Sequence, residues 1–528
     1  MFMKQVKILL AAAGTMMLLA SCDSFLDKLP DDRAELNSIE KVQKLLSTAY
    51  PQNSADFGLE MSSDNVNDNG RSFAAQPSQE KYYRWEAVET TGNDDPRSIW
   101  NGGYEAIATA NEALAALEKL PQSNLTRSLR AEGLLCRAFS MFQLANTFCM
   151  SWNPAKGKEY LGLPYPKVAG VSVDSRGTLA ELYANINADI EEALPMLNDG
   201  YLTAPKYHFN AKAAYAFAAR FNLFYMNYDK AIEYANKVLG NNSMAVLRNY
   251  ASYVGLAGVN DIKNKYVQSS ESANLLLVTA YSTAGRAPYS VSYRRFAHSR
   301  TITTYETIWA NMPWSKGNNS INSTLYLARL LYGNTQQVRF PKLDEFFEVR
   351  DKIAQTGFAH IVDAVFTTDE TLLVRAEAYA LKEDYVNALA DMNAWILTHC
   401  SERRGEGVRP TLTEESVNNF VNAAKTVPDV VKADTLRSFK KPMTPQGFTI
   451  KAGTQTNLLY LILHMRRIET LFQGMRFLDI KRYGIRFSHF VDGETEPLAF
   501  ESGDLRGAIQ LPQDVITAGL EPNPRKKK

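Results

Sequence analysis

The sequence predicts a mainly α-helical protein, in which a scaffold of tetratricopeptide-like helical repeats carries long irregular loop insertions. Two observations lead to this prediction. Apolar residues recur at intervals of three and four from residue 38 onward, as they do in amphipathic helices. Two segments of the chain also align with each other as helix-turn-helix units. No strand-like alternation of comparable length is seen.

Three segments show the helical spacing most clearly. They lie at residues 104–117, 134–142 and 183–197, where Tyr, Ile, Leu, Phe and Ala fall on one face of a 3.6-residue period. We therefore place all three in the scaffold.

A shift of 157 residues aligns the two repeat units. The matched pairs are Ala219 with Ala376, Tyr228 with Tyr385, Ala231 with Ala388, Ile232 with Leu389, and Asn236 with Asn393. Within each unit two alanines lie 12 residues apart, where two antiparallel helices must approach closely. This spacing is typical of tetratricopeptide repeats, whose stacked helices present faces suited to protein partners.

The first residues read as a secretory signal. Lys4 and Lys7 accompany an apolar run from Ile8 to Ala20, which is shorter than the roughly 20 residues that a membrane-spanning helix needs. The run ends in Leu-Ala-Ser followed by Cys22. This pattern predicts cleavage before Cys22 and lipid on its thiol, so we expect an exported lipoprotein. An ordinary cleaved signal or an uncleaved anchor is the alternative.

We divide the chain into a signal peptide over 1–21, a lipidated acidic strap over 22–37 and a single domain over 38–528. Within the domain, the predicted scaffold and the predicted ligand-side insertions alternate. The scaffold covers roughly 38–240, 366–400 and 455–484, and the insertions cover roughly 51–100, 241–365, 400–455 and 485–510.

Charge and cysteine content exclude several classes of protein. The formal charge of +1 becomes −1 once the signal and its two lysines are removed, whereas a nucleic-acid partner calls for a net basic face. Beyond Cys22 there are three cysteines with no CxxC spacing, so we expect no disulfide framework and no zinc site.

The sequence also carries no catalytic signature that we can identify. None of its six histidines has HExxH spacing, and neither a GxSxG elbow nor a glycine-rich phosphate loop is present. Paired carboxylates can meet in space without meeting in sequence, so a glycosidase is not excluded by motif alone. We predict a binding protein that is not an enzyme and has no cofactor.

Short motifs occur in a fixed order along the chain. They are Trp100 with Tyr104, Ile107 and Asn111; AEGLLCRAF at 131–139; GLP at 162–164; LVRAEAY at 373–379; the arginine-rich stretch 466–482; and AIQLP at 508–512 with Asn523-Pro524. Together with the lipobox, this set resembles the SusD/RagB family of Bacteroidetes outer-membrane lipoproteins.

The resemblance implies a surface-exposed, lipid-anchored nutrient-binding protein of the outer membrane. Such a protein lies as a lid over a TonB-dependent transporter of the SusC type, captures an oligosaccharide and hands it to the transporter. A peptide-capturing lid of the RagB kind is the second interpretation. A repeat-built adaptor without a small ligand is the third.

Sugar binding requires flat aromatic faces beside amide, carboxylate and guanidinium groups, and two loops offer this mixture. The first runs from Glu60 to Trp85 and the second from Tyr289 to Asn319. Residues 65–70 of the first loop have part of a calcium-loop spacing, but Gln76 stands where its last acid belongs. We therefore expect a surface turn there and no metal.

From these loops we select ten candidate ligand-binding residues. They are Asp64, Asn65, Arg71, Tyr82, Trp85, Tyr289, Tyr293, Arg294, Trp309 and Trp314. Trp309 and Trp314 lie among Asn, Pro and Gly residues, where a large aromatic side chain is less easily buried. We expect alanine at either position to weaken ligand binding without unfolding the protein.

Overall fold

A computed structural model describes residues 36–169, 175–315, 319, 323–402, 409–428 and 436–525. The predicted signal peptide, Cys22 and nearly all of the strap lie outside these residues. Within them, no helix is both long and apolar enough to cross a membrane.

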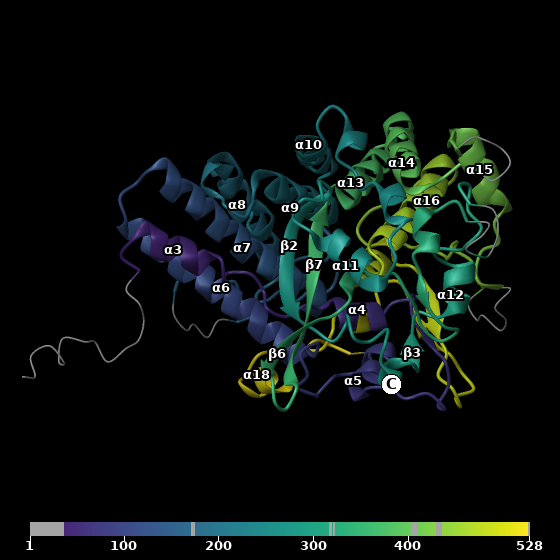
Figure 1. Cartoon of the computed structure of the whole chain (residues 1–528), viewed down its shortest axis with the longest axis horizontal. Coiled ribbons are helices and arrows are strands. Elements are labelled where there is room, and N and C mark those ends of the chain that lie inside the picture. Colours follow the sequence, from purple (N-terminus) through teal and green to yellow (C-terminus); the bar gives the residue numbers. More distant parts are fainter. Residues whose placement is uncertain are drawn as a thin grey trace, which may run out of the picture.

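The prediction of a mainly helical fold is confirmed. Figure 1 shows α8, α9, α10, α13, α14 and α15 along the upper part of the molecule and α3, α6 and α7 to the left, while β2 and β7 run down the middle toward β6. The helices are α3 (Ile39–Leu46), α4 (Asp56–Met61), α5 (Pro77–Tyr83), α6 (Pro96–Lys119), α7 (Asn124–Phe148), α8 (Leu179–Ala193), α9 (Ala211–Phe224), α10 (Tyr228–Leu239), α11 (Val259–Val267), α12 (Arg300–Tyr305), α13 (Thr368–Leu381), α14 (Tyr385–His399), α15 (Glu414–Ala423), α16 (Thr454–Glu469), α17 (Met475–Tyr483) and α18 (Gln513–Thr517).

Strands are short apart from two. They are β1 (Asn67–Asp68), β2 (Asn274–Tyr281), β3 (Phe296–Ala297), β4 (Tyr332–Gly333), β5 (Val338–Arg339), β6 (Phe346–Asp351), β7 (Thr356–Thr367), β8 (Phe487–His489) and β9 (Leu498–Phe500). Three of them form an antiparallel sheet in the order β2-β7-β6, and the others pair as β1-β3, β4-β5 and β8-β9.

The internal repeat predicted from the sequence is present in the structure. Helix α9 begins at Ala211 and α13 at Thr368, and their partners α10 and α14 begin at Tyr228 and Tyr385, so both pairs differ by the predicted 157 residues. The turns also correspond, because Met226 and Glu383 both adopt φ of +65°.

The paired alanines explain why these helices can pack closely. Ala219, Ala231, Ala376 and Ala388 are all fully buried, and α9 contacts α10 while α13 contacts α14. A larger side chain at these positions would force the helices apart.

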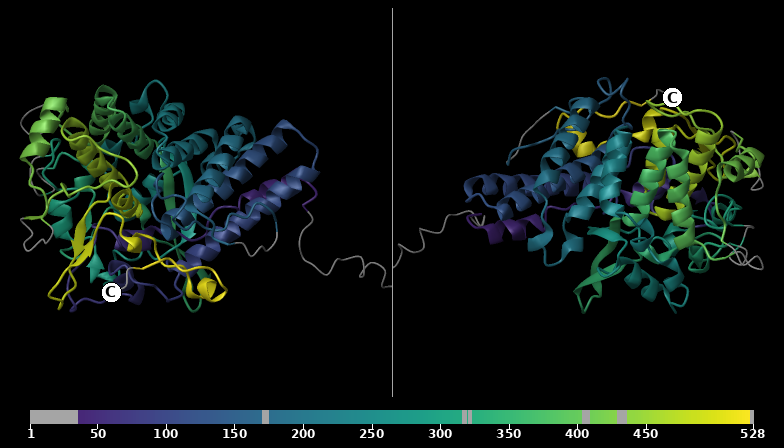
Figure 2. Two further views of the ribbon diagram at one scale, coloured as in Figure 1. Left: turned by 180° about the vertical axis from the view of Figure 1, so that it is seen from behind. Right: turned by 90° about the horizontal axis from the view of Figure 1, so that it is seen from above.

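Helix α7 occupies the centre of the helical layer. It lies between α6 and α8, and its side chains are buried on nearly all faces, Phe139 and Phe142 among them. Its N-terminus is fixed by Ser123, whose hydroxyl accepts a hydrogen bond from the backbone of Thr126. The rear and top views show the layered arrangement from two more sides (Figure 2).

The long strand β7 departs from the sequence analysis, which found no long strand-like alternation. Its inner half is buried on both faces, with Asp363, Ala364 and Phe366 all enclosed. Its outer half, near Thr356 and Phe358, is largely exposed. Neither half therefore alternates cleanly between apolar and polar residues, which removes the period-2 signal.

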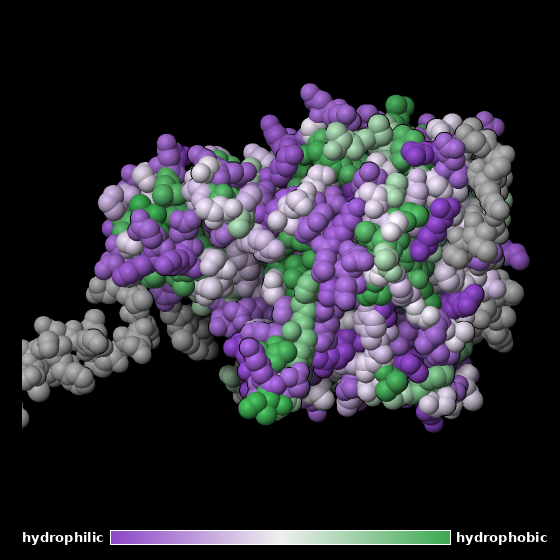
Figure 3. Space-filling model, viewed as in Figure 1, coloured by the Kyte–Doolittle hydropathy of each residue, from purple (hydrophilic) through white to green (hydrophobic). Residues whose placement is uncertain are grey.

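The predicted insertions contain short elements of their own. Helices α4 and α5 lie within 51–100, the three-stranded sheet and α11 and α12 lie largely within 241–365, and α15 lies within 400–455. The face of the molecule in Figure 3 carries apolar residues only in small scattered groups among polar ones.

Candidate functional site

The two loops predicted to bind ligand meet in the structure. Strand β1 of the first loop pairs antiparallel with β3 of the second, with Asn67 opposite Ala297 and Asp68 opposite Phe296. The side chain of Asn69 extends the junction by donating to the carbonyl oxygen of Arg294 at 2.7 Å. Segments more than 220 residues apart are thereby joined into one surface, which we call the loop junction.

Asp68 fixes the position of the junction electrostatically. Its carboxylate accepts two hydrogen bonds from the guanidinium of Arg295, at 3.1 and 3.0 Å, and it also accepts from the backbone of Asp492 at 3.0 Å. A bidentate arginine–carboxylate pair holds both partners in one orientation. Asp68 therefore ties the two loops to the C-terminal segment.

A third segment, the turn at 334–337 between β4 and β5, completes the junction. The Asn69 amide donates to the carbonyl of Gln336 at 3.1 Å, and the backbone of Arg300 donates to the carbonyl of Thr335 at 3.1 Å. Neither this turn nor Arg300 was among the candidate ligand-binding residues predicted from the sequence. The pair Gly333-Asn334, two residue types that favour turns, is the only sequence signal for the turn.

Four of the ten candidates remain at or near the surface of this region. Arg71 and Tyr289 are exposed, Tyr289 with 42% of its surface accessible. Arg294 and Trp309 are half-buried. The guanidinium of Arg300 lies over the ring of Trp309, 5.6 Å from its centroid. Nε of Arg294 is buried and has no hydrogen-bond partner within the described residues.

Asp64 and Asn65 are buried, which corrects their selection as ligand residues. Asp64 accepts hydrogen bonds from Arg476 at 2.8 Å and from Lys441 at 2.6 Å. The amide oxygen of Asn65 accepts from Nε of Arg467 at 2.7 Å. Carboxylates and amides in a polar loop normally face solvent. Here the side chains of Asp64 and Asn65 are buried because they pair with three cations from the C-terminal third of the chain.

This buried network has unusual electrostatics. Burial by itself raises the pKa of Asp64, but the neighbouring charges of Arg467, Arg476 and Lys441 outweigh it and hold that pKa well below its usual range. Glu306 lies in the same network, and Lys441, Arg467 and Arg437 lower its pKa to about 2 despite its burial. Both acids therefore stay ionised in the interior.

Tyr82, Trp85 and Tyr293 are also buried, so they cannot contact a ligand at this surface. The Tyr82 hydroxyl donates to the carbonyl of Asp94 at 2.8 Å, and the Trp85 indole donates to the carbonyl of Ser62 at 2.8 Å. Trp85 also stacks on His489, with centroids 4.8 Å apart. Tyr293 is 7% exposed and packs edge-on against Phe57.

Trp314 is the clearest correction, because its side chain is fully buried. It lies in a turn closed by Met312 and Ser315, as its Pro-rich and Asn-rich neighbours suggest. The ring nevertheless points into the core, 5.7 Å from Trp395 of α14 and 5.9 Å from His464 of α16. The loop-like sequence therefore predicted the turn of the backbone correctly, but the expectation that the tryptophan side chain is exposed was wrong.

Comparisons with known proteins agree with this architecture. Residues 24–223 match the model of a family described as "Starch-binding associating with outer membrane". A SusD superfamily protein from Bacteroides thetaiotaomicron VPI-5482 is 20% identical, with a TM-score of 0.61 over 92% of this chain and 100% of that one. The chain therefore has the SusD-like fold.

Further solved structures share this fold at low identity. A SusD superfamily protein from Bacteroides vulgatus ATCC 8482 is 17% identical, with a TM-score of 0.62 over 93% of this chain and 99% of that one. A "laminarin binding SusD-like protein" is 15% identical, with a TM-score of 0.54 over 92% and 99%. A search of the curated proteins found no match.

The arginine-rich motif at 466–482 is part of the scaffold and also holds the loops in place. Arg466 pairs with Asp479 at 3.1 Å and with Glu377 at 3.3 Å, and Arg482 pairs with Glu377 at 2.7 Å. All of these side chains are buried. The motif therefore joins α13, α16 and α17, while its Arg467 and Arg476 pair with Asp64 of the first loop.

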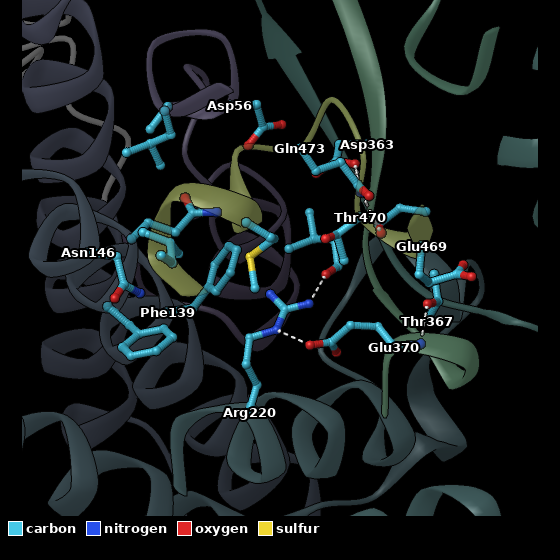
Figure 4. A pocket seen from close by; sticks show the side chains of 18 of the residues that line it. Asp56, Phe139, Asn146, Arg220, Asp363, Thr367, Glu370, Glu469, Thr470 and Gln473 are labelled. Carbon is cyan, nitrogen blue, oxygen red and sulfur yellow. Dashed lines mark hydrogen bonds and ion pairs between the residues drawn. The ribbon is translucent and has the colours of Figure 1, made fainter. Parts of the chain in front are cut away.

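A well-formed cavity lies elsewhere, between the helical layer and the sheet (Figure 4). It has a volume of about 70 Å³, and none of the ten candidate residues lines it. Clefts that hold drug-sized ligands measure roughly 300–1,000 Å³. The cavity is thus too small for an oligosaccharide, and the loop junction remains the candidate ligand face.

Metal-ligating side chains are not clustered in the part of the chain that the structure describes. No group of three or more His, Cys, Asp or Glu residues there is arranged to hold a metal ion. Cys136, Cys149 and Cys400 are buried free thiols.

Proposed function

We propose that this SusD-like protein is a cell-surface nutrient-binding lipoprotein that captures an oligosaccharide at the loop junction. The observation that carries the proposal is that the two loops selected for sugar chemistry come together on one surface of a fold whose family model is described as starch-binding. A structure with the same fold is named for binding laminarin, which adds support for a glycan ligand.

The chemistry of the junction suits a carbohydrate. Trp309 and Tyr289 offer aromatic rings for the apolar side of a pyranose, each with one face covered by a guanidinium, Arg300 over Trp309 and Arg339 over Tyr289. Arg71, Arg294 and Arg300 offer guanidinium donors for hydroxyl groups.

We further propose that an acylated Cys22 anchors the protein at the outer membrane and that a SusC-type TonB-dependent transporter receives the ligand. The anchor keeps the body near the surface while leaving it free to move. Replacing Cys22 by Ala should leave folding and ligand binding intact and release the protein from the membrane fraction. Retention of the Cys22→Ala protein at the surface would show that partner contacts suffice.

The central experiment is calorimetric titration of the chain without its signal against a panel of oligosaccharides and peptides. We expect binding of a glycan, and we expect Trp309→Ala and Arg300→Ala each to weaken it roughly tenfold or more, since each removes a direct ligand contact. Tyr207→Ala is the matched control, because Tyr207 is a 44% exposed aromatic residue outside the loop junction.

Three results would contradict the proposal in different ways. Binding of peptides instead of glycans at the same face would give the peptide-capturing alternative. Binding that is insensitive to both variants would place the site elsewhere. Shortening of the oligosaccharide in proportion to protein concentration would make the protein an enzyme.

A further inference from the structure

The cavity between the helical layer and the sheet has walls of two chemical kinds. Polar groups come from α4, α7, α9, β7 and the segment after α16, and also from Tyr266 of α11, Glu370 of α13 and Glu469 at the end of α16, with apolar side chains between them. The apolar members are Leu59, Phe139, Phe142, Met475 and Leu478. A volume of about 70 Å³ is several times what one water molecule needs, roughly 10–15 Å³ on this measure.

One end of the cavity carries an incompletely paired guanidinium. Arg220 extends into the cavity from α9 (Figure 4) and is only 8% exposed. Its Nε donates to Glu370 at 3.1 Å and its Nη2 to the carbonyl of Val365 at 2.6 Å. Its Nη1 has no hydrogen-bond partner in the described part of the chain. The N–H donors on Nη1 of this buried guanidinium are suited to a carboxylate oxygen.

The other end carries two carboxyl groups, as Figure 4 shows, with Asp56 and Asp363 on the side away from Arg220. Asp363 accepts a hydrogen bond from Gln473 at 2.6 Å, while Oδ2 of Asp56 is buried with no partner within the described residues. Carboxyl groups enclosed without enough donors favour a cationic partner that can supply them.

The surroundings of this acidic end disfavour negative charge on its two carboxyl groups when no further cation is bound. Burial, and then the neighbouring Asp363, raise the pKa of Asp56 well above its usual value. The charged groups that face Asp56 are Asp363, Glu60 and Lys342, and those that face Asp363 are Lys342 and Arg220. Burial also raises the pKa of Asp363, even though Gln473 and Lys342 oppose the change.

We propose that this cavity binds a small zwitterion of the amino-acid class, with its carboxylate on Nη1 of Arg220 and its ammonium group on Asp363 and Asp56. The apolar walls receive a small side chain. A neutral polyol would leave the acidic end without a counter-charge, and a simple cation would leave Arg220 Nη1 unpaired. This site is separate from the loop junction and adds a second binding function to oligosaccharide capture.

The test is calorimetric titration of the folded chain with L-alanine, with acetate, ethylamine and glucose as single-feature probes. We expect alanine to bind and each of the other three to bind at least tenfold more weakly. β-Alanine and 4-aminobutyrate extend the series, and the tightest member reports the separation of the two charged ends. Alanine affinity should rise with pH as the two carboxyl groups ionise.

Variants of the lining residues test whether alanine binds in this cavity. Asp56→Asn and Asp363→Asn each remove an ionisable carboxyl group with little change in shape, and Arg220→Lys keeps a cation near Glu370 but loses Nη1. We expect each to weaken alanine binding roughly tenfold or more. Asp229→Asn, which changes an 80% exposed carboxylate on α10, is the matched control. Thermal unfolding of each variant checks that the fold is kept.

Several outcomes would overturn the inference. These are no alanine binding at millimolar concentration, acetate or ethylamine binding as tightly as alanine, or glucose binding in place of both. Binding that is unchanged in both Asp variants would do so as well. Because the titration contains no glycan, its failure leaves the proposed capture of oligosaccharide standing.

Discussion

Two regions rich in arginine differ in the burial and the carboxylate pairing of their guanidinium groups. In the C-terminal motif, Arg466, Arg467 and Arg476 are buried and each pairs with at least one carboxylate. At the loop junction, Arg71 and Arg300 are exposed and have no carboxylate partner within the described residues. The arginines of the C-terminal motif therefore hold the scaffold together, while the exposed arginines of the loop junction belong to no motif.

The strongest way to test this contrast is to remove a buried partner. Asp64→Asn leaves Arg467, Arg476 and Lys441 close together with one counter-charge fewer. We expect the free energy of unfolding to fall by about 3–5 kcal/mol, because uncompensated charge is left in the interior. Urea denaturation followed by circular dichroism measures it, and a loss below about 1 kcal/mol would show that solvent reaches the network.

Trp314 provides a test that involves packing alone. Trp314→Ala opens a void beside Trp395 and His464, and we expect a loss of about 3–5 kcal/mol of stability. Trp309→Ala is the matched control, because Trp309 is half-buried and should cost much less. Comparable losses for the two tryptophans would mean that both belong to the core.

The pH dependence of Glu306 follows from its pKa of about 2, which lies below the usual 4.5. A depressed folded-state pKa contributes stability above pH 4.5, and that stability is lost as the pH falls toward 2. We expect the wild-type protein to exceed Glu306→Gln in stability at pH 7 by on the order of 3 kcal/mol, and the difference to shrink toward pH 2. A difference independent of pH would show that Glu306 acts through hydrogen bonding alone.

The smallest effect is expected at the loop junction. Arg300→Ala removes an exposed side chain that lies over Trp309, and we expect stability to change by no more than about 0.5 kcal/mol. Chemical denaturation beside the wild type checks this. A loss above about 2 kcal/mol would give Arg300 a structural role like that of the motif arginines and would remove the contrast between the two regions.

The sequence by itself predicted the helical scaffold and the spacing of its repeat. The reason is that amphipathic periodicity and small residues at helix contacts are local properties, so Ala219 and Ala376 could be matched without knowing their neighbours. The sequence also selected both loops of the candidate ligand face, but their meeting through the backbone pairing of β1 with β3 was not predicted.

Only the tertiary structure decided which side chains in those loops face solvent. Asp64 and Trp314 stand in polar, loop-like sequence, yet one is enclosed by cations from residues 441–476 and the other by α14 and α16. Burial depends on partners hundreds of residues away in sequence, and a local pattern cannot contain them. The cavity that brings Arg220 together with Asp56 and Asp363 is of the same kind, since its walls come from separate elements that meet only when the chain folds.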